Sequence, residues 1–346
     1  MTRKREPVKR SRGPVQEFER DDVEIAKFNA LRDRVGYATP DEPVPPGSRC
    51  MLVKERGIPI ARLSCTIAVE VQGAPGYTGL IGHYESTDPK SGTYLLKHAV
   101  QRLREQGADR ILGPMNGSTW GRYRLALPPE PRDGDPEPPF LSEPSNPADY
   151  PLDFQAAGFR VGATYESAIV EDLGTADPRR DELAERVRAR GATIRPLDPG
   201  RFDDELRAIF ELSRTAFAEN LYYSPIEFDE FRARYLPLRP LLDPEMVRLA
   251  EDADGRLLGF VFAFPDLLSA SNGRPTRVVL KTLASAPEAR GMGLGTFLTD
   301  EVRRVADENG YRSVIHALMQ ADNESVRISR HSARVFRRYA LYELVD

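Results

Sequence analysis

The chain is poor in the residues that metal centres and disulfide frameworks need. Its 346 residues include two cysteines, Cys50 and Cys65, and four histidines that are spread along the sequence. Two cysteines cannot build a disulfide scaffold or a cysteine-based zinc site, so no metal is expected. No apolar run reaches the length of about 18 residues that a membrane-spanning helix requires. A membrane partner is therefore not expected either.

The chain also lacks an excess of positive charge. It has 49 Lys and Arg residues and 53 Asp and Glu residues, which gives a formal net charge of −4. A protein that coats nucleic acid needs a strongly basic face, so no nucleic-acid partner is expected. Residues 1–14 are basic but contain no apolar signal core, which favours a disordered tail on a cytoplasmic protein. The alternative for this tail is a basic contact arm.

A proline-rich segment interrupts the first half of the chain. Nine prolines lie between Leu127 and Leu152. Proline lacks a backbone donor and disrupts helices and central strands, so we expect residues 127–152 to form a long surface loop.

The remaining pattern repeats one order of elements: strands, helix, strand, helix, strand. We infer two copies of one α/β unit, over residues 15–174 and 175–346. The first copy is predicted to begin with a helix over residues 15–35. In the second copy a helix is predicted over residues 293–308, with its apolar face toward a sheet. Its apolar positions are Leu294, Leu298, Val302 and Val305.

A glycine-rich loop precedes that helix. It reads Arg290-Gly291-Met292-Gly293-Leu294-Gly295-Thr296 and follows a strand that ends in Leu283-Ala284-Ser285. Alternating glycines let successive N–H groups converge on an anion at a helix N-terminus, and Arg290 adds a fixed positive charge. A Walker loop needs a Gly-Lys pair, which the chain lacks, and the dinucleotide fingerprint fails at Thr296 and Leu298.

The pattern Arg-x-x-Gly-x-Gly at Arg290, Gly293 and Gly295 resembles the acyl-CoA pyrophosphate loop of the GCN5-related N-acetyltransferase (GNAT) superfamily. The resemblance covers residues 193–346. It implies an α/β fold: two tandem GNAT-like domains, each a mixed, mostly antiparallel twisted sheet flanked by helices. It further implies that acetyl-CoA is held by the residues of the strand end, the loop and the next helix start. These are Leu283, Ala284, Ser285, Arg290, Gly291, Met292, Gly293, Leu294, Gly295, Thr296 and Asn323.

The resemblance implies direct transfer to an amine but leaves the acid–base residues open. Many members carry a general-acid Tyr seven residues after the Asn, and this position is Arg330 here. The acceptor usually lies near the loop between the first two helices. Glu219 is a candidate base, and Tyr222 or Tyr223 is a candidate acid. Each has a structural alternative, Asp266 is a weaker base, and His316 is expected to be a core histidine.

The first half lacks the glycine loop. Its equivalent junction holds one glycine, Gly92, with Glu85 and Asp88 beside it. Carboxylates at a helix start cap it and repel a pyrophosphate, so this half is predicted to be a degenerate copy. Asn116 and Trp120 are candidates for an acceptor pocket there. The alternative is a loop buried for packing.

We therefore predict an acyl-CoA-dependent N-acyltransferase that transfers an acetyl group from acetyl-CoA to an amine. Two alternatives remain. One is a CoA-binding sensor without catalysis, which the missing Tyr favours. The other is an aminoacyl-tRNA-dependent peptidyl transferase, against which the charge of −4 and the intact loop both argue. The sequence identifies neither the acceptor nor the oligomeric state.

Overall fold

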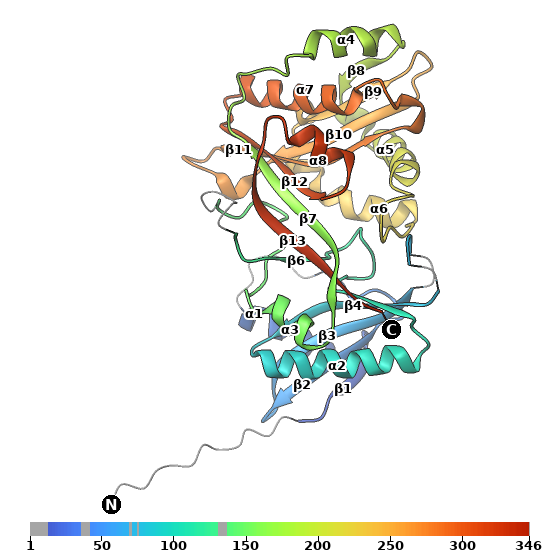
Figure 1. Ribbon diagram of the computed structural model, residues 1–346, viewed down its shortest axis with the longest axis vertical. Helices are drawn as coiled ribbons and strands as arrows, with labels where there is room; N and C mark the ends of the chain where they lie inside the picture. The colour runs from blue at the N-terminus through green and yellow to red at the C-terminus, as the bar shows by residue number, and fades with distance from the viewer. Residues whose placement is uncertain (1–12, 36–41, 69–70, 75, 131–136, 346) are drawn as a thin grey trace, which may run out of the picture. The chain divides into compact units, whose positions relative to one another are not determined.

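The computed structural model describes residues 13–35, 42–68, 71–74, 76–130 and 137–345 (Figure 1). The tail predicted over residues 1–14 therefore lies almost wholly outside the described residues. Contacts divide the chain into two compact units that do not follow chain order. Unit 1 comprises Met1–Ala126, Pro144–Ala163 and Ala340–Asp346, and unit 2 comprises Leu127–Glu143 and Thr164–Tyr339.

Unit 1 is built on a sheet with the strand order β1–β2–β3–β4–β5–β13. β4 and β5 run parallel, whereas the other neighbours run antiparallel. The strands are β1 (Gln16–Glu19), β2 (Arg49–Glu55), β3 (Ile58–Ala68), β4 (Thr78–Ser86), β5 (Arg110–Gly113) and the end of β13 (Arg334–Val345), with the short β6 (Leu125–Ala126) beside β13. The helices are α1 (Ile25–Val35), α2 (Pro89–Glu105) and α3 (Tyr150–Ala156).

Unit 2 repeats the arrangement with the order β13–β7–β12–β11–β10–β9–β8, and its parallel pair is β11 and β12. Its strands are β7 (Arg160–Val170), β8 (Thr193–Pro196), β9 (Val247–Glu251), β10 (Leu257–Pro265), β11 (Arg277–Ser285) and β12 (Ser313–Gln320). Its helices are α4 (Arg180–Ala189), α5 (Phe202–Ala216), α6 (Phe228–Tyr235), α7 (Leu294–Glu308) and α8 (Glu324–Ser329). Both units thus show the predicted mixed, mostly antiparallel sheet flanked by helices.

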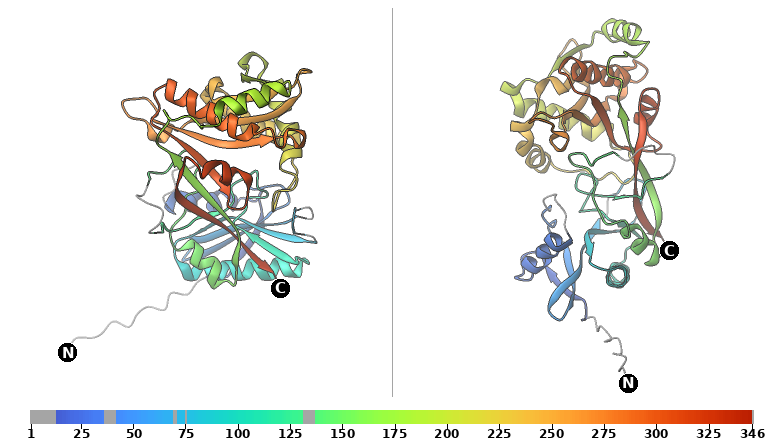
Figure 2. Two further views of the ribbon diagram at one scale, coloured as in Figure 1. Left: turned by 45° about the horizontal axis from the view of Figure 1, so that its top comes forward. Right: turned by 90° about the vertical axis from the view of Figure 1, so that its left-hand side faces the viewer.

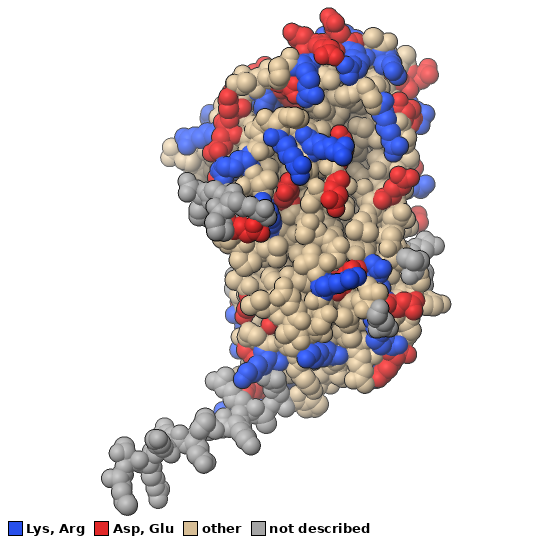
Figure 3. All heavy atoms as spheres, viewed as in Figure 1, with Lys and Arg blue, Asp and Glu red and all other residues tan. Residues whose placement is uncertain are grey.

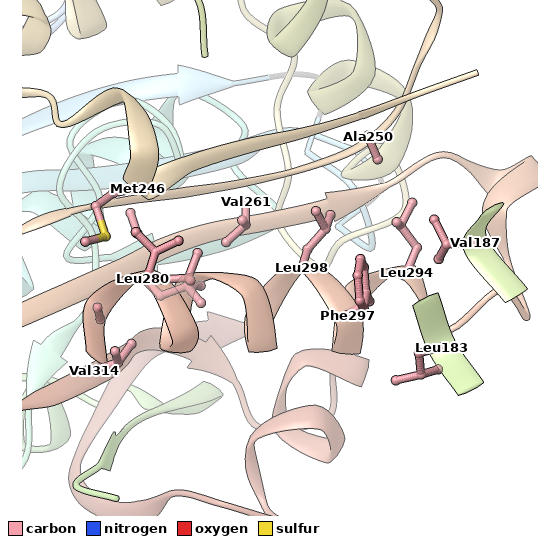
Figure 4. Packing of buried hydrophobic residues seen from close by; sticks show 14 of the residues in the cluster. Leu183, Val187, Met246, Ala250, Val261, Leu280, Leu294, Phe297, Leu298 and Val314 are labelled. Atoms are coloured by element: carbon pink, nitrogen blue, oxygen red, sulfur yellow. The ribbon is translucent and has the colours of Figure 1, made fainter. Parts of the chain in front are cut away.

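The core of unit 2 confirms the predicted face of α7. Leu294, Leu298, Val302 and Val305 are buried in one cluster with residues of β10, β11 and β12 (Figure 4). Helices cover both faces of this sheet (Figure 2). Val261 on β10 belongs to the α7 cluster, whereas the ring of its neighbour Phe262 packs against Tyr235 of α6. Successive strand residues point to opposite faces, so α7 and α6 lie on opposite sides.

The helix predicted over residues 15–35 is wrong in its first part. Residues 16–19 form β1, which pairs antiparallel with β2, and the helix begins at Ile25. Phe18 on β1 lies edge-on against Phe28 of α1 in a small buried cluster. Pairing with β2 and this burial, which helical spacing cannot reveal, decide the conformation of the segment.

The proline-rich segment has no helix or strand among its described residues before α3, as predicted, but it is not simply a surface loop. Phe140 and Glu143 are buried. The guanidinium of Arg277 on β11 donates to the carbonyl oxygens of Pro138 and Pro139 at 3.2 and 2.9 Å. Residues 137–143 are therefore fastened to unit 2.

The face shown in Figure 3 carries Lys and Arg residues beside Asp and Glu residues, without a broad area of one sign. Within the described ranges, no helix has the length and apolarity that crossing a bilayer requires. No group of metal-ligating side chains is found among these residues either.

Candidate functional site

Two neighbouring strands of unit 2 separate half-way along their length. The parallel pair β11 and β12 is hydrogen-bonded over four residues and ends at Leu280 and His316. Beyond this point the two strands do not pair, although β11 continues to Ser285 and β12 to Gln320. Over residues 282–285, the backbone groups on this edge of β11 therefore have no partner strand within the described part of the chain.

Both strands carry a bulge where they separate. The register between β11 and β10 skips Lys281, and the register between β12 and β7 shifts between His316 and Met319. Within the second bulge, Leu318 has a left-handed φ of 59°. A bulge bends its strand and increases the local twist. Leu283, Ala284 and Ser285 lie on the separated part of β11, where the resemblance placed them.

The glycine loop joins β11 to α7. Gly291 and Gly293 have φ values of 78° and 73°, which favour glycine, and Gly293 is the N-cap of α7. No side chain caps this helix, and its first turn has no carboxylate. In the described part of the chain, the backbone N–H groups of Gly291 and of residues 293–296 donate to no backbone carbonyl. Together with the helix dipole, these five N–H groups suit an anion.

The side chains around the loop differ in what they can contribute. Arg290 is exposed, whereas Met292 and Leu294 are buried in the core and offer only their backbones. Asn323 is the N-cap residue of α8 but makes no capping bond with its side chain. A Cβ on Gly295 would lie 3.1 Å from Ile328 of α8 and 3.5 Å from Leu283 of β11, so strand, loop and α8 meet there.

Helix α4 supplies a residue that sequence reasoning missed. A Cβ on Gly293 would overlap Leu183 of α4, and Arg186 Nη1 lies 3.9 Å from the same position. Arg186 also pairs with Glu182 one turn away. A second guanidinium therefore lies beside the glycine loop. No local sequence pattern indicates this residue, because more than 100 residues of chain separate α4 from the loop.

The candidate acid–base residues differ in exposure. Glu219 is exposed in the loop after α5. Tyr222 is buried and has a left-handed φ of 64°. Burial raises the pKa of the Tyr223 hydroxyl. Arg330 is exposed at the end of α8. The catalytic roles of Glu219, Tyr222 and Tyr223 stay predictions.

Two other titratable residues have structural roles. His316 is a buried histidine, as predicted, and its Nδ1 is hydrogen-bonded to Ser329. Burial lowers its pKa to about 4, so it is neutral at pH 7. Asp266, the weaker candidate base, is wholly buried. Its carboxylate pairs with Arg277 at 2.7 Å and accepts the Leu141 N–H at 2.9 Å, which leaves it no role as a base.

Residues 206–328 match the model of the acetyltransferase (GNAT) family. The match spans α5 to α8 and includes the separated strands and the glycine loop. Residues 206–328 therefore form a domain of the GNAT family.

Solved structures support the tandem GNAT fold over nearly the whole chain. A tandem GNAT protein from the clavulanic acid biosynthesis pathway is 15 % identical, with a TM-score of 0.52, and 96 % of this chain and 98 % of that chain are covered. A GCN5-related N-acetyltransferase from Anabaena variabilis is 8 % identical, with a TM-score of 0.56, and the coverage is 96 % and 73 %. At these identities the likeness shows the fold alone.

Two curated relatives match part of this chain. The "Bacterial ceramide synthase" of Caulobacter vibrioides is 23 % identical over 223 residues, which are 63 % of this chain and 56 % of that protein. Protein YghO of Escherichia coli is 25 % identical over 197 residues, which are 56 % of this chain and 48 % of that protein. The chain thus spans about half the length of the curated relatives it matches.

The first GNAT-like unit has the same strand separation, but its own chain fills it. β4 and β5 stop pairing after Leu80 and Leu112. Beyond this point Met115 N–H donates to Ile81 O at 2.7 Å, and His83 N–H donates to Asn116 Oδ1 at 2.8 Å. The strand edge that corresponds to residues 282–285 of β11 is therefore occupied in β4.

The helix start of unit 1 is occupied as well. Asp88 caps α2 by accepting the Ser91 N–H, as predicted, and the Tyr84 hydroxyl takes the space beside Gly92. Glu85 does not lie free at the helix start. It is buried and paired with Arg62 and Arg32 at 2.9 and 2.6 Å. Its carboxylate neutralises the buried Arg62 and the half-buried Arg32.

The two acceptor-pocket candidates lie in the loop that fills unit 1. Asn116 is buried, and its side chain binds His83 N–H through Oδ1 and Glu42 through Nδ2. Trp120 is half-buried, and its backbone N–H donates to Ser118 Oγ at 3.2 Å. The Asn116 amide thus holds its own loop in place, and an acceptor pocket at these residues stays a prediction.

Proposed function

We propose that this GNAT protein transfers the acetyl group of acetyl-CoA to an amine in unit 2. The observation that carries the proposal is that the N–H groups of the glycine loop lie next to the strand edge of residues 282–285, and that neither has a backbone partner among the described residues. The N–H groups of the glycine loop suit the pyrophosphate, and the edge of β11 beside it suits the amides of pantetheine. Arg290 and Arg186 add positive charge at the pyrophosphate end.

The proposed reaction is a direct displacement. The free amine attacks the thioester carbonyl, the C–N bond forms, the C–S bond breaks, and CoA leaves as its thiol. A backbone N–H of β11 stabilises the charge on the carbonyl oxygen. Glu219 removes the proton from the incoming ammonium, and Tyr222 or Tyr223 protonates the departing thiolate. Arg330 occupies the usual position of the acid, and a guanidinium cannot supply that proton.

One acyl-CoA binds per chain in this proposal. In unit 1 the equivalent strand edge is bonded to Met115 and Asn116, and Asp88 caps the equivalent helix. A pyrophosphate there would meet a carboxylate in place of unpartnered N–H groups. Unit 1 therefore serves through packing and, as a further expectation, through contacts with the acceptor.

Thermal unfolding with acetyl-CoA tests the proposal. Ligand at 100 times its dissociation constant stabilises the folded state by about 2.7 kcal/mol, which raises the melting temperature measurably. Long-chain acyl-CoAs belong in the same panel, because one relative carries the name ceramide synthase. Binding without turnover on an amine panel would favour the sensor alternative. A melting temperature that no acyl-CoA moves would overturn the proposed function.

A further inference from the structure

A continuous chain of hydrogen bonds runs from the strand separation of unit 2 to the proline-rich segment. Leu318 N–H on β12 donates to Ser167 Oγ on β7 at 3.0 Å, and Ser167 Oγ lies 3.1 Å from the hydroxyl of Tyr339 on β13. The Tyr339 hydroxyl donates to Glu143 Oε1 at 2.6 Å. Ser167 and Tyr339 are wholly buried, and Glu143 is 8 % exposed.

The carboxylate of Glu143 determines which group donates in each of these hydrogen bonds. The Glu143 carboxylate accepts the single proton of the Tyr339 hydroxyl, so Tyr339 is left to accept from Ser167. Ser167 in turn accepts the Leu318 N–H, and each hydroxyl thus donates once and accepts once. Arg337 Nε, 3.1 Å from Glu143 Oε1, and the Phe140 N–H, 3.2 Å from Oε2, hold the carboxylate in place.

The series of hydrogen bonds begins at the bulge on β12. His316 pairs with Ala168 and Met319 with Glu166, so two residues of β12 lie opposite the single residue Ser167 of β7. Leu318 has its left-handed φ here, and a left-handed conformation costs energy for a residue other than glycine. Such a conformation persists only when neighbouring contacts fix it, and the Ser167 hydroxyl provides one.

We propose that Ser167, Tyr339 and Glu143 are positioning residues for the pantetheine end of the acyl-CoA site. They hold the β12 bulge that keeps β12 apart from β11, and the proline-rich segment supplies the last member of the chain. The proposal rests on the proposed function, because it assigns the space between β11 and β12 to pantetheine. None of the three residues is a catalytic residue.

The test compares binding of the whole CoA molecule with binding of its nucleotide end alone. Ser167→Ala and Tyr339→Phe are compared with wild type for binding of CoA and of 3′-phosphoadenosine 5′-diphosphate, which lacks pantetheine. We expect each variant to weaken CoA by about tenfold, as for the loss of one hydrogen bond, and to leave the nucleotide within about twofold. Tyr311→Phe, a tyrosine near the opposite end of β12, is the matched control and should change neither.

Amide hydrogen exchange at Leu318 gives a second measurement without ligand. The Leu318 N–H should exchange faster in Ser167→Ala and Tyr339→Phe, while residues 313–316 of β12 stay protected. Unchanged exchange, unchanged CoA binding, or equal weakening of CoA and nucleotide would overturn the positioning role. Wild-type protein that binds neither ligand, with faster Leu318 exchange in the variants, would instead overturn the proposed function.

Discussion

At the scale of single residues, the glycine loop and the charges beside it decide what unit 2 can bind. Gly293 is a poor choice for a test, because a side chain there would overlap Leu183 and disturb packing as well as binding. Arg290 is exposed, so we expect its removal to affect the ligand rather than the fold. The cleanest probes of the site are therefore its arginines.

Arg290→Ala should weaken acetyl-CoA binding by about tenfold, since a charge-assisted contact to phosphate is lost. Arg186→Ala should have a similar effect, because its guanidinium lies beside Gly293. The unfolding temperature without ligand should stay near that of wild type. Arg312→Ala, an exposed arginine of the same unit, is the control. Calorimetric titration measures the affinity, and wild-type affinity in both variants would remove these arginines from the site.

Asp153 gives unit 1 a pH-dependent stability. Burial raises the pKa of this carboxyl to about 6 from its usual value of 3.8, with Asp149 and Asp88 contributing. The folded state therefore holds the proton more tightly, and stability falls as the pH rises from about 4 to about 6. Asp153→Asn keeps an acceptor for the Tyr84 hydroxyl, 2.7 Å away, and removes the charge.

We expect Asp153→Asn to be more stable than wild type by about 3 kcal/mol at pH 8, because the pKa is raised by about two units and one unit corresponds to about 1.4 kcal/mol. Near pH 4 the two proteins should be alike. Urea unfolding at the two pH values measures this difference. A variant whose stability relative to wild type does not depend on pH would show that Asp153 has an ordinary pKa.

At the scale of elements, the ion pair of Asp266 and Arg277 fastens the proline-rich segment. Asp266→Ala leaves a buried guanidinium without its carboxylate and frees the Leu141 N–H. We expect a loss of about 3–5 kcal/mol of unfolding free energy and faster proteolysis within residues 137–143. Asp254→Ala, in an exposed turn, should cost less than about 0.5 kcal/mol. Equal protease resistance in wild type and Asp266→Ala would refute the fastening role.

Elements with a strong local signal were predictable from the sequence. The apolar spacing of α7 and the alternating glycines before it depend on neighbours in sequence, and both are found as predicted. β1 was missed because its conformation depends on pairing with β2. The attachment of residues 137–143 and the position of α4 beside Gly293 depend on contacts across more than 100 residues, which no local pattern encodes.

At the scale of the whole molecule, the same fold occurs in both units, but the units differ at the edge of their separated strands. Both units have a parallel strand pair that separates after a few residues. In unit 1, groups of Met115 and Asn116 occupy this strand edge. In unit 2, the edge of residues 282–285 and five amides of the glycine loop have no backbone partner among the residues that the structure describes. The missing glycines of unit 1 predicted a lost site, but the filling loop could be seen only in three dimensions.

Calorimetric titration of the full chain with acetyl-CoA is the most direct test of this division between the units. The account predicts a stoichiometry of one acetyl-CoA per chain, with binding weakened by Arg290→Ala and unaffected by Asp88→Asn, which alters only the helix start of unit 1. Two equivalents per chain would contradict it, because unit 1 would then bind despite its filled strand edge. Absence of binding would contradict the assignment of the glycine loop to acyl-CoA.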